Sequence, residues 1–230
     1  MEDYYYFYLQ PSQTVTVLMY SLTELTKKLS TIVNKKDPES PSIFKDDEEN
    51  LLRDCIRKFL IYLNQLPSDH ILSSSDIVNG LNLKPHPEGG FYRRYIWTKE
   101  KSAIFYLLPT GSVSSWHRLK ETRETWKWLY GETLNVAHIS NDSEEIGVFQ
   151  LTQSEDVVID EGMYGRGKWG DWFGAYHEGN GFSLAYCQCT PPFEFAKFEL
   201  ANEQIVNRFK SLHPTYTEII ERLTIKTKES

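Results

Sequence analysis

The chain has 230 residues, of which 40% are hydrophobic and 14% aromatic, and its formal net charge at pH 7 is −7. An acidic chain lacks the clustered Lys and Arg side chains that displace counterions from nucleic acids or hold a protein on an anionic membrane surface, so we expect neither partner. The length suffices for one large all-β domain, or two small ones, with a real hydrophobic core.

The N-terminus and the cysteines indicate the compartment. The opening residues MEDYYYFYLQ lack the basic-then-apolar order of a secretory signal, and no run approaches the roughly 18 apolar residues that span a bilayer. Three cysteines, Cys55, Cys187 and Cys189, are too few and too odd in number for a disulfide framework. We therefore expect an intracellular, cytoplasmic protein.

Residues 1–73 are expected to form a partly helical N-terminal extension. The tyrosine-rich start is compatible with a strand or a helix, and the polar stretch 35–49 is typical of a linker. Apolar residues at three-to-four spacing then predict an amphipathic helix from about Glu48 to Leu66. The residues from Ser73 to Asp76 offer N-caps for a short helix through Gly80.

From Gly89 to about Leu200 the pattern changes to short β-type segments separated by turns. We expect strands at 91–98, 103–108, 112–119, 125–130, 133–139, 147–151, 156–159 and 182–190, with a glycine-rich loop at 162–170. Many short strands at regular spacing indicate a sandwich or a barrel. An amphipathic helix, broken at Pro214, is expected over 204–223.

The segment LKPHPEGGFYR, from Leu83 to Arg93, resembles the opening of the cupin 5 family, small single-domain cupins of unassigned function in the RmlC-like jelly-roll superfamily. The similarity continues through 102–108, 112–134, 191–201 (PPFEFAKFELA) and 213–224. It implies an all-β fold: a single cupin-type jelly-roll β-barrel with a C-terminal helix over 74–224, after the extension 1–73 and before a tail at 225–230. It also implies a homodimer.

The spacing of Gly111, His117, Glu124 and Gly131 is similar to the motif of metal-binding cupins, in which a His-x-His pair and a glutamate hold the ion. Side chains two apart on a strand face the same way, so such a pair presents two imidazoles to one interior. Here the second histidine is replaced by Leu119, which removes one of three N/O ligands. We therefore expect no cofactor.

A metal site remains an alternative. In the second cupin motif, Gly165 stands where a histidine is usual, but His177 follows in the next segment. A divalent metal would then be held by His117, Glu124 and His177. This arrangement would make the protein a metal-dependent cupin oxygenase.

Without a metal, His117 and Glu124 form the candidate catalytic centre. A neutral imidazole oriented by a carboxylate is a competent general base near pH 7. An alternative is that His117 is a structural histidine held by Glu124 or Ser115.

The strand positions of Tyr106, Ser115, Trp126 and Gln188 make them candidates for ligand binding, although core filling is the alternative for Trp126. Arg94 and Lys127 would favour an anionic ligand if they point inward.

These residues support one functional hypothesis and two alternatives. The first is a barrel that binds a small molecule, with metal-independent isomerase- or epimerase-like chemistry at His117 and Glu124. Nucleotide-sugar epimerases share this fold, but that analogy concerns the fold alone. The alternatives are a non-catalytic binding or interaction protein with a degenerate site and the metal-dependent oxygenase, so whether the protein is an enzyme stays open.

Overall fold

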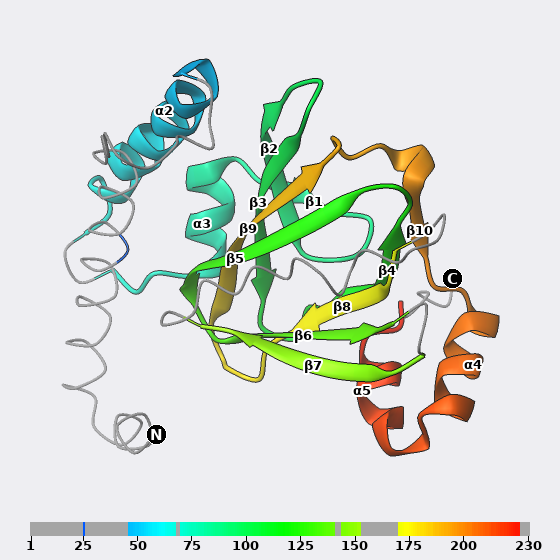
Figure 1. Ribbon diagram of the computed structural model, residues 1–230. Helices are drawn as coiled ribbons and strands as arrows, with labels where there is room; N and C mark the ends of the chain where they lie inside the picture. The colour runs from blue at the N-terminus through cyan, green and yellow to red at the C-terminus, as the bar shows by residue number, and fades with distance from the viewer. Residues whose placement is uncertain (1–24, 26–45, 68–69, 141–143, 153–169, 226–230) are drawn as a thin grey trace, which may run out of the picture. The chain divides into compact units, whose positions relative to one another are not determined.

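The computed structural model describes residues 25, 46–67, 70–140, 144–152 and 170–225 (Figure 1). These residues divide into two compact units, of which the first ends at Asn82 and the second begins at Leu83. The tyrosine-rich start, the expected strand at 156–159 and nearly all of the glycine-rich stretch at 162–170 lie outside the described residues.

The first unit contains helices α2 (Asp46–Leu63) and α3 (Ser74–Leu81), which confirms both helices expected there. On α2, the buried residues Ile56, Phe59 and Leu63 recur at three-to-four spacing and form one apolar face. Ser73 caps α3 through a capping box, because its side chain accepts from the backbone N–H of Asp76 while the Asp76 carboxylate accepts from the backbone N–H of Ser73.

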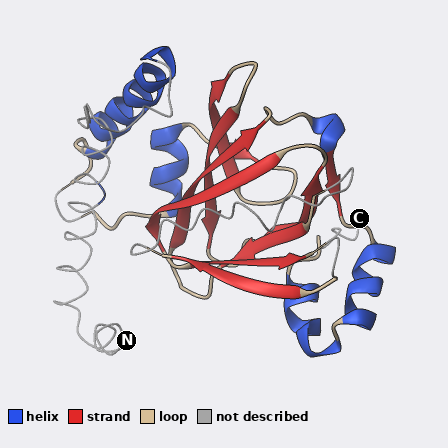
Figure 2. Ribbon diagram, in the orientation of Figure 1, coloured by secondary structure: helices blue, strands red, loops and turns tan. Residues whose placement is uncertain are grey.

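The second unit consists of two five-stranded antiparallel sheets (Figures 1 and 2). The first sheet, in the order β1-β2-β3-β9-β5, contains β1 (Lys84–Pro85), β2 (Phe91–Trp97), β3 (Ser102–Pro109), β9 (Phe182–Thr190) and β5 (Arg123–Gly131). The second sheet, in the order β10-β4-β8-β6-β7, contains β10 (Phe198–Leu200), β4 (Ser114–Leu119), β8 (Trp172–Tyr176), β6 (Leu134–Ile139) and β7 (Ile146–Leu151). The all-β expectation is therefore confirmed.

The two sheets do not close into a barrel. Among the described residues, every pair of hydrogen-bonded strands lies within one sheet, so β1 and β5 remain edges of the first sheet and β10 and β7 remain edges of the second. Closure would require a ladder between edge strands, and β1 and β10 have only two and three residues. The expected jelly-roll architecture is present as a sandwich.

Strand β8 was not expected from the sequence. All five of its residues are buried, so it shows no alternation of polar and apolar side chains. It pairs with β4 on one side and with β6 on the other, which places it inside the second sheet. Gly174 sits at its centre because a Cβ there would lie 2.7 Å from the carbonyl oxygen of Ser114.

Two helices cover the outer face of the second sheet. Helix α4 (Glu203–Leu212), the 3-10 turn η2 (Pro214–Tyr216) and helix α5 (Thr217–Arg222) confirm the expected helix broken at Pro214. Phe209 and Ile220 are buried against strand residues that include Trp116 and Trp172. The indole N–H of Trp116 donates to the carbonyl oxygen of Ile220 at 3.1 Å, which fixes α5 on the sheet.

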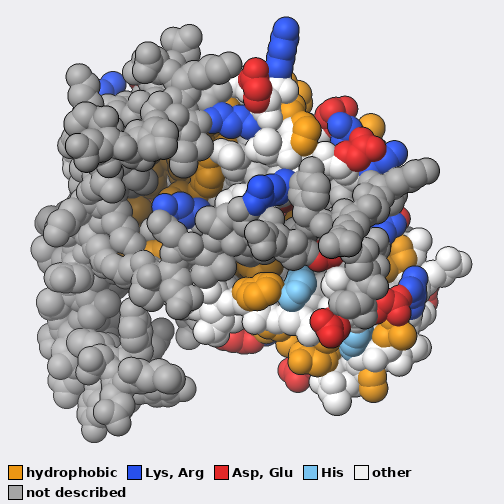
Figure 3. All heavy atoms as spheres, in the orientation of Figure 1, with side chains coloured by type: hydrophobic (Ala, Val, Ile, Leu, Met, Phe, Trp, Pro, Cys, Tyr) orange, Lys and Arg blue, Asp and Glu red, His pale blue; other side chains and the backbone are white. Residues whose placement is uncertain are grey.

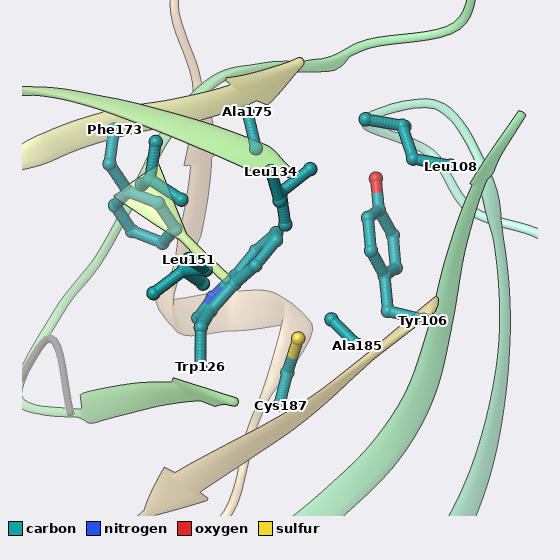
Figure 4. Close-up of a cluster of buried hydrophobic side chains, with 10 residues drawn as sticks. Tyr106, Leu108, Trp126, Leu134, Leu151, Phe173, Ala175, Ala185 and Cys187 are labelled. Atoms are coloured by element: carbon teal, nitrogen blue, oxygen red, sulfur yellow. The ribbon is translucent and has the colours of Figure 1, made fainter. Parts of the chain in front are cut away.

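The inner faces of the two sheets meet in an apolar cluster (Figure 4). Its members are Tyr106, Leu108, Trp126, Leu134, Val136, Leu151, Phe173, Ala175, Ala185 and Cys187. In Figure 4 the indole of Trp126 lies among Leu134, Leu151 and Phe173, so side chains of β5 reach across to those of β6, β7 and β8.

The surface adds two observations. On the face drawn in Figure 3, acidic and basic side chains are interspersed and are not gathered by sign. In the described part of the chain, no helix combines the length and the apolar character needed to cross a membrane.

Candidate functional site

A pocket with a volume of about 50 Å³ lies beside the apolar cluster, between β2, β3, β9 and β5 of the first sheet and β4 and β10 of the second. Its lining combines two histidines and two glutamates with six Phe, Tyr and Trp rings. The histidines and glutamates are His86, Glu88, His117 and Glu124, and the rings belong to Tyr92, Tyr106, Trp126, Phe193, Phe195 and Phe198. Glu88, His117 and Glu124 are all buried, so their charges are strongly influenced by one another.

Glu88 enters the pocket from the tight turn between β1 and β2. The backbone N–H of Gly89 donates to the carbonyl oxygen of His86, and the N–H of His86 donates to that of Gly90, both at 3.0 Å. Gly89 has φ +112°, and a Cβ there would lie 2.1 Å from the carbonyl oxygen of Val113. Only glycine tolerates that conformation and that approach, so the glycines allow the turn to direct Glu88 inward.

Glu88 and His117 face each other across the pocket. Nε2 of His117 lies 3.3 Å from Oε2 of Glu88, and Nδ1 lies 2.7 Å from the carbonyl oxygen of Ser115. A carbonyl oxygen only accepts, so Nδ1 carries a proton and Nε2 of the neutral ring is an acceptor. A hydrogen bond between Nε2 and Glu88 therefore requires one further proton, held by either group. We call these two residues the Glu88–His117 pair.

Burial shifts both members of the pair toward their neutral forms. Burial lowers the pKa of His117 from 6.5 to about 4, and the Ser115 carbonyl only partly opposes that shift. Burial also raises the pKa of Glu88, against the attraction of His86 and the hydrogen bond from Ser114. The hydroxyl of Ser114 donates to Oε1 of Glu88 at 2.8 Å. Such a coupled pair titrates as a unit.

Glu124, on β5, is the second buried acid of the pocket. Burial raises its pKa from 4.5 to about 8, and repulsion from Glu88 adds to the shift. The indole of Trp126 favours the carboxylate and partly offsets the shift. Glu124 is therefore largely protonated at neutral pH, and it exchanges its proton close to physiological pH.

Burial also shifts the pKa values of His86, Cys187 and Cys189 in the pocket lining. Burial lowers the pKa of His86, and the nearby charge of Glu88 partly opposes that shift. Burial raises the pKa of Cys187 and Cys189 well above the usual thiol value, and Glu124 adds to both shifts. Both thiols are therefore protonated, and they are poor nucleophiles. The proton chemistry of the pocket lies with its acids and histidines.

Comparison with known proteins identifies the family. The model of the family described as "Cupin superfamily (DUF985)" matches residues 75–201, more than half of the chain. The chain belongs to this cupin family. No match was found among curated proteins.

Two solved structures share the fold of this cupin. A protein of Shewanella oneidensis is 28% identical, with a TM-score of 0.55, and the match covers 68% of this chain and 99% of that one. A hypothetical protein from Leishmania major is 21% identical, also with a TM-score of 0.55, and the match covers 67% of this chain and 100% of that one. The two-sheet jelly-roll fold is thus shared across nearly the full length of both proteins.

The structure brings together four of the seven site residues expected from the sequence and leaves three apart. His117, Glu124, Tyr106 and Trp126 line one pocket. Outside the lining, Ser115 orients His117 through its backbone carbonyl. Gln188 and His177 do not line the pocket.

Gln188 lies on the opposite face of β9 from the pocket. The pocket is lined by Cys187 and Cys189, and alternation along the strand turns Gln188 the other way. Its side-chain oxygen accepts from the hydroxyl of Tyr186 at 2.7 Å. The expectation that Gln188 contacts a ligand in this cupin pocket therefore does not fit its position.

His177 does not join His117 and Glu124. Its Nε2 lies 3.0 Å from the carbonyl oxygen of Leu108, and it is not part of the pocket lining. Of the described residues, no three His, Cys, Asp or Glu side chains are arranged to hold a metal ion. Both ring nitrogens of His117 also face other groups, so the ligand set proposed for a metal-dependent cupin does not fit this arrangement.

The two basic residues considered for an anionic ligand lie at the surface. Lys127 is exposed and lies outside the pocket lining. Arg94 reaches the lining but is exposed, and its guanidinium stacks over the ring of Trp97 at 3.8 Å. Neither places a fixed positive charge in the interior of the cupin pocket.

Glu88 is the site residue that the sequence analysis missed. Its segment, HPEGG, resembles the opening of the family, and the two consecutive glycines indicate an unusual turn. A buried glutamate cannot be recognised from its own residue type, because most glutamates are exposed. The same turn also contributes His86 to this cupin site.

Proposed function

We propose that this cupin binds a small organic molecule and transfers protons on it without a metal, as an isomerase- or epimerase-like enzyme. The observation that carries this proposal is the Glu88–His117 pair, with 3.3 Å between Oε2 and Nε2, inside a pocket that also contains the buried Glu124. Proton-transfer enzymes need an acid and a base with different proton affinities that face the same ligand.

The two groups have distinct roles. In its unprotonated state, the Glu88–His117 pair can take a proton from the ligand, and the proton then occupies the bond between the two residues. Glu124 carries a proton at neutral pH because its pKa is about 8, so it can donate to the opposite end of the ligand. A general acid and base are most effective when their pKa values lie near the working pH.

The size of the pocket limits the ligand. A water molecule needs roughly 10–15 Å³ of such volume, so a pocket of about 50 Å³ accepts only a few polar atoms at its inner end. The rest of the molecule must lie toward Phe193 and Phe195, of which Phe195 is 60% exposed. This favours a small substrate with one reactive group over a nucleotide sugar.

The test is hydrogen–deuterium exchange. The protein is incubated in D₂O with small ketones, aldehydes and hydroxy acids, and NMR follows loss of carbon-bound hydrogen. We expect exchange at one position of at least one compound, with a rate that falls at least about 100-fold in His117→Ala and Glu88→Gln, since general acid–base groups contribute about that much. His138→Ala, a half-buried histidine of β6, is the matched control and should keep the wild-type rate.

Thermal unfolding of each variant separates the alternatives. The proposal requires that Glu88→Gln, which preserves the size of the side chain, keeps the fold and loses exchange. If His117→Ala and Glu88→Gln both exchange at the wild-type rate, the pair is structural and the proposal is wrong. If the wild-type protein exchanges no compound but still binds one, the cupin is a binding protein.

A further inference from the structure

We infer that the ligand is a small carbonyl compound with a flat apolar body, whose oxygen is held between the indole N–H of Trp126 and the carboxyl group of Glu124. This inference rests on the proposed function, for which it names the substrate class. It starts from one buried hydrogen-bond donor of the pocket, the indole N–H of Trp126, which has no acceptor among the described residues.

Trp126 provides the first donor. Its side chain is 1% exposed and lines the pocket. Within the part of the chain that the structure describes, its Nε1 has no hydrogen-bond partner of normal geometry. An unsatisfied buried N–H costs roughly 1–3 kcal/mol, and an oxygen from a bound molecule would remove that cost.

Glu124 provides the second donor. Glu124 and Trp126 are two apart on β5 and pair with Cys189 and Cys187 of β9, so both side chains lie on the pocket face. They are close enough for the indole to affect the carboxyl group, although the N–H does not reach full hydrogen-bond geometry. A protonated Glu124 donates toward the same space, so two donors converge on one acceptor.

The charges of the pocket favour a neutral carbonyl group over an ionic one. Among the described residues that line the pocket, Arg94 is the one basic side chain other than the histidines, and it is exposed and stacks on Trp97, so it does not hold a carboxylate or phosphate in the interior. Two neutral donors can instead stabilise an oxygen on which negative charge develops during a reaction. That is the arrangement required when a proton is removed from the carbon beside a carbonyl.

The apolar body is inferred from the pocket mouth. Phe193 contacts Phe195 and Phe198 with ring centroids 5.0 and 5.7 Å apart. Phe195 is 60% exposed, so an apolar ring remains open to solvent at the edge of a buried polar pocket. Rings in this position cover a flat apolar group of a ligand.

The reaction then balances within the pocket. The Glu88–His117 pair removes the proton from the carbon next to the carbonyl, the C–H electrons form a carbon–carbon double bond, and the carbonyl electrons move to the oxygen. Glu124 donates its proton to that oxygen and an enol forms. The reverse transfers, with the same carbon protonated on its other face, complete an epimerisation without an oxidant. Where that carbon also carries a hydroxyl group, the enol is an enediol, and protonation of the former carbonyl carbon with loss of the hydroxyl proton completes an isomerisation.

The experiment compares binding of phenol, a planar mimic of an enol, with binding of toluene and benzylamine, by calorimetry and tryptophan fluorescence. We expect phenol to bind at least about tenfold more tightly than toluene, since one hydrogen bond is worth about 1.4 kcal/mol. Trp126→Phe should remove that preference and leave toluene binding nearly unchanged. Glu124→Gln should keep it, because an amide N–H₂ still donates, whereas Glu124→Leu should lose it.

Two binding results would overturn the inference. Equal binding of phenol and toluene overturns the inference. So does tighter binding of benzylamine that disappears in Glu124→Gln, which would identify a cation site with an ionised glutamate. Because Trp126 also fills the core, the two Glu124 variants test the inference even if Trp126→Phe does not fold.

Deuterium exchange of 2-indanone separates this inference from the proposed function. If phenol binding follows the expected pattern but His117→Ala does not slow exchange of 2-indanone, the carbonyl site stands and the proton-transfer function fails. If His117→Ala slows exchange while the preference for phenol over toluene persists in Glu124→Leu, the function stands and the carbonyl site fails.

Discussion

The space between the two sheets has two halves, and they are built differently from the same strands. In one half, which we call the filled half, apolar side chains of both sheets fill the interior, with Leu134, Val136 and Leu151 at most 1% exposed. In the other, which we call the polar half, Glu88 and His117 face each other, and a pocket of about 50 Å³ remains. Both halves are buried, so burial alone does not decide which becomes a site.

Three residues belong to both halves. Tyr106, Trp126 and Cys187 are members of the apolar cluster and also line the pocket. The hydroxyl of Tyr106 donates to the carbonyl oxygen of Gly89 at 2.8 Å, which connects β3 to the turn that holds Glu88. The filled half thus forms a wall against which the polar half is positioned.

The unfavourable free energy of burying carboxyl groups at the site is offset by apolar burial elsewhere in the fold. Transferring a carboxyl group from water into the protein interior is unfavourable, and the raised pKa values of Glu88 and Glu124 are a direct expression of that cost. The filled half stabilises the fold because each buried large aliphatic side chain contributes about 1.5–3 kcal/mol. Substitutions in the filled half should therefore mainly lower the free energy of unfolding, whereas substitutions in the polar half should mainly change how that free energy depends on pH.

The largest effect is expected in the filled half. Leu134→Ala should lower the free energy of unfolding by about 2–5 kcal/mol, because it leaves a cavity among side chains that cannot collapse. Urea unfolding measures this loss. The matched control is Leu212→Ala, at a position on α4 that is 44% exposed, which should change stability by about 0.5 kcal/mol or less. Similar losses at both positions would contradict the division into halves.

The second effect is a dependence of stability on pH that originates in the polar half. The folded-state pKa of Glu124 is about 8 and the unfolded value is 4.5, so the folded protein holds a proton that the unfolded chain has lost between those values. This contribution is complete below about pH 4.5 and is lost as the pH rises through about 8. Stability should therefore fall by up to about 1.4 kcal/mol per pH unit in this range.

The window from pH 6.5 to 8 isolates this effect from His117. The pKa of His117 is lowered from 6.5 to about 4, so its contribution is present above pH 6.5 and is lost as the pH falls toward 4. Glu124→Gln should flatten the fall of stability above pH 6.5, measured by urea unfolding at a series of pH values. Part of the slope should remain, because burial raises the pKa of Glu88 too. An unchanged slope in Glu124→Gln would show that Glu124 is ionised throughout.

Most of the fold could be predicted from the sequence, because its elements carry local patterns. Alternation and turn residues predicted seven of the ten strands in the described residues. Three-to-four spacing predicted α2 and the helical segment broken at Pro214, and N-cap residues predicted α3. The exceptions were β1, β8 and β10. Two of these are too short to show alternation, and β8 is buried on both faces because α4 and α5 cover the outer side of its sheet. Burial by a distant helix cannot be recognised from the residue pattern of the strand alone.

The site could be predicted only in part. The similarity to the motif of metal-binding cupins singled out His117 and Glu124, and both line the pocket. The partner of His117 was expected to be Glu124 or Ser115, and the structure adds Glu88, which is 29 positions earlier in the chain and faces Nε2 across two elements. Glu88 and His117 meet because the turn that contains Glu88 is hydrogen-bonded to β4. The backbone N–H of Ser115 donates to the carbonyl oxygen of Glu88. The residue pattern cannot show that bond.

The smallest expected effect is a difference in the free energy of unfolding between substitutions of two buried serines. One serine has a hydrogen-bond partner and the other has none among the described residues. Ser114 donates to Oε1 of Glu88 at 2.8 Å and is 0% exposed. Ser183 on β9 is 1% exposed, and its hydroxyl has no hydrogen-bond partner among the described residues. Ser114→Ala should lower the free energy of unfolding by about 1–2 kcal/mol, because it removes a hydrogen bond and leaves a buried carboxyl oxygen unsatisfied.

Ser183→Ala should be neutral or slightly stabilising in the same urea unfolding experiment, because it removes a polar group that already lacks a partner. The two variants delete the same atom at equal burial, so the difference between them measures the Ser114–Glu88 bond. Ser114→Ala should also raise the pKa of Glu88 further, since that bond lowers it. Equal effects of the two substitutions would mean that Ser114 does not hold Glu88, and the polar half would then lose the contact that positions its base.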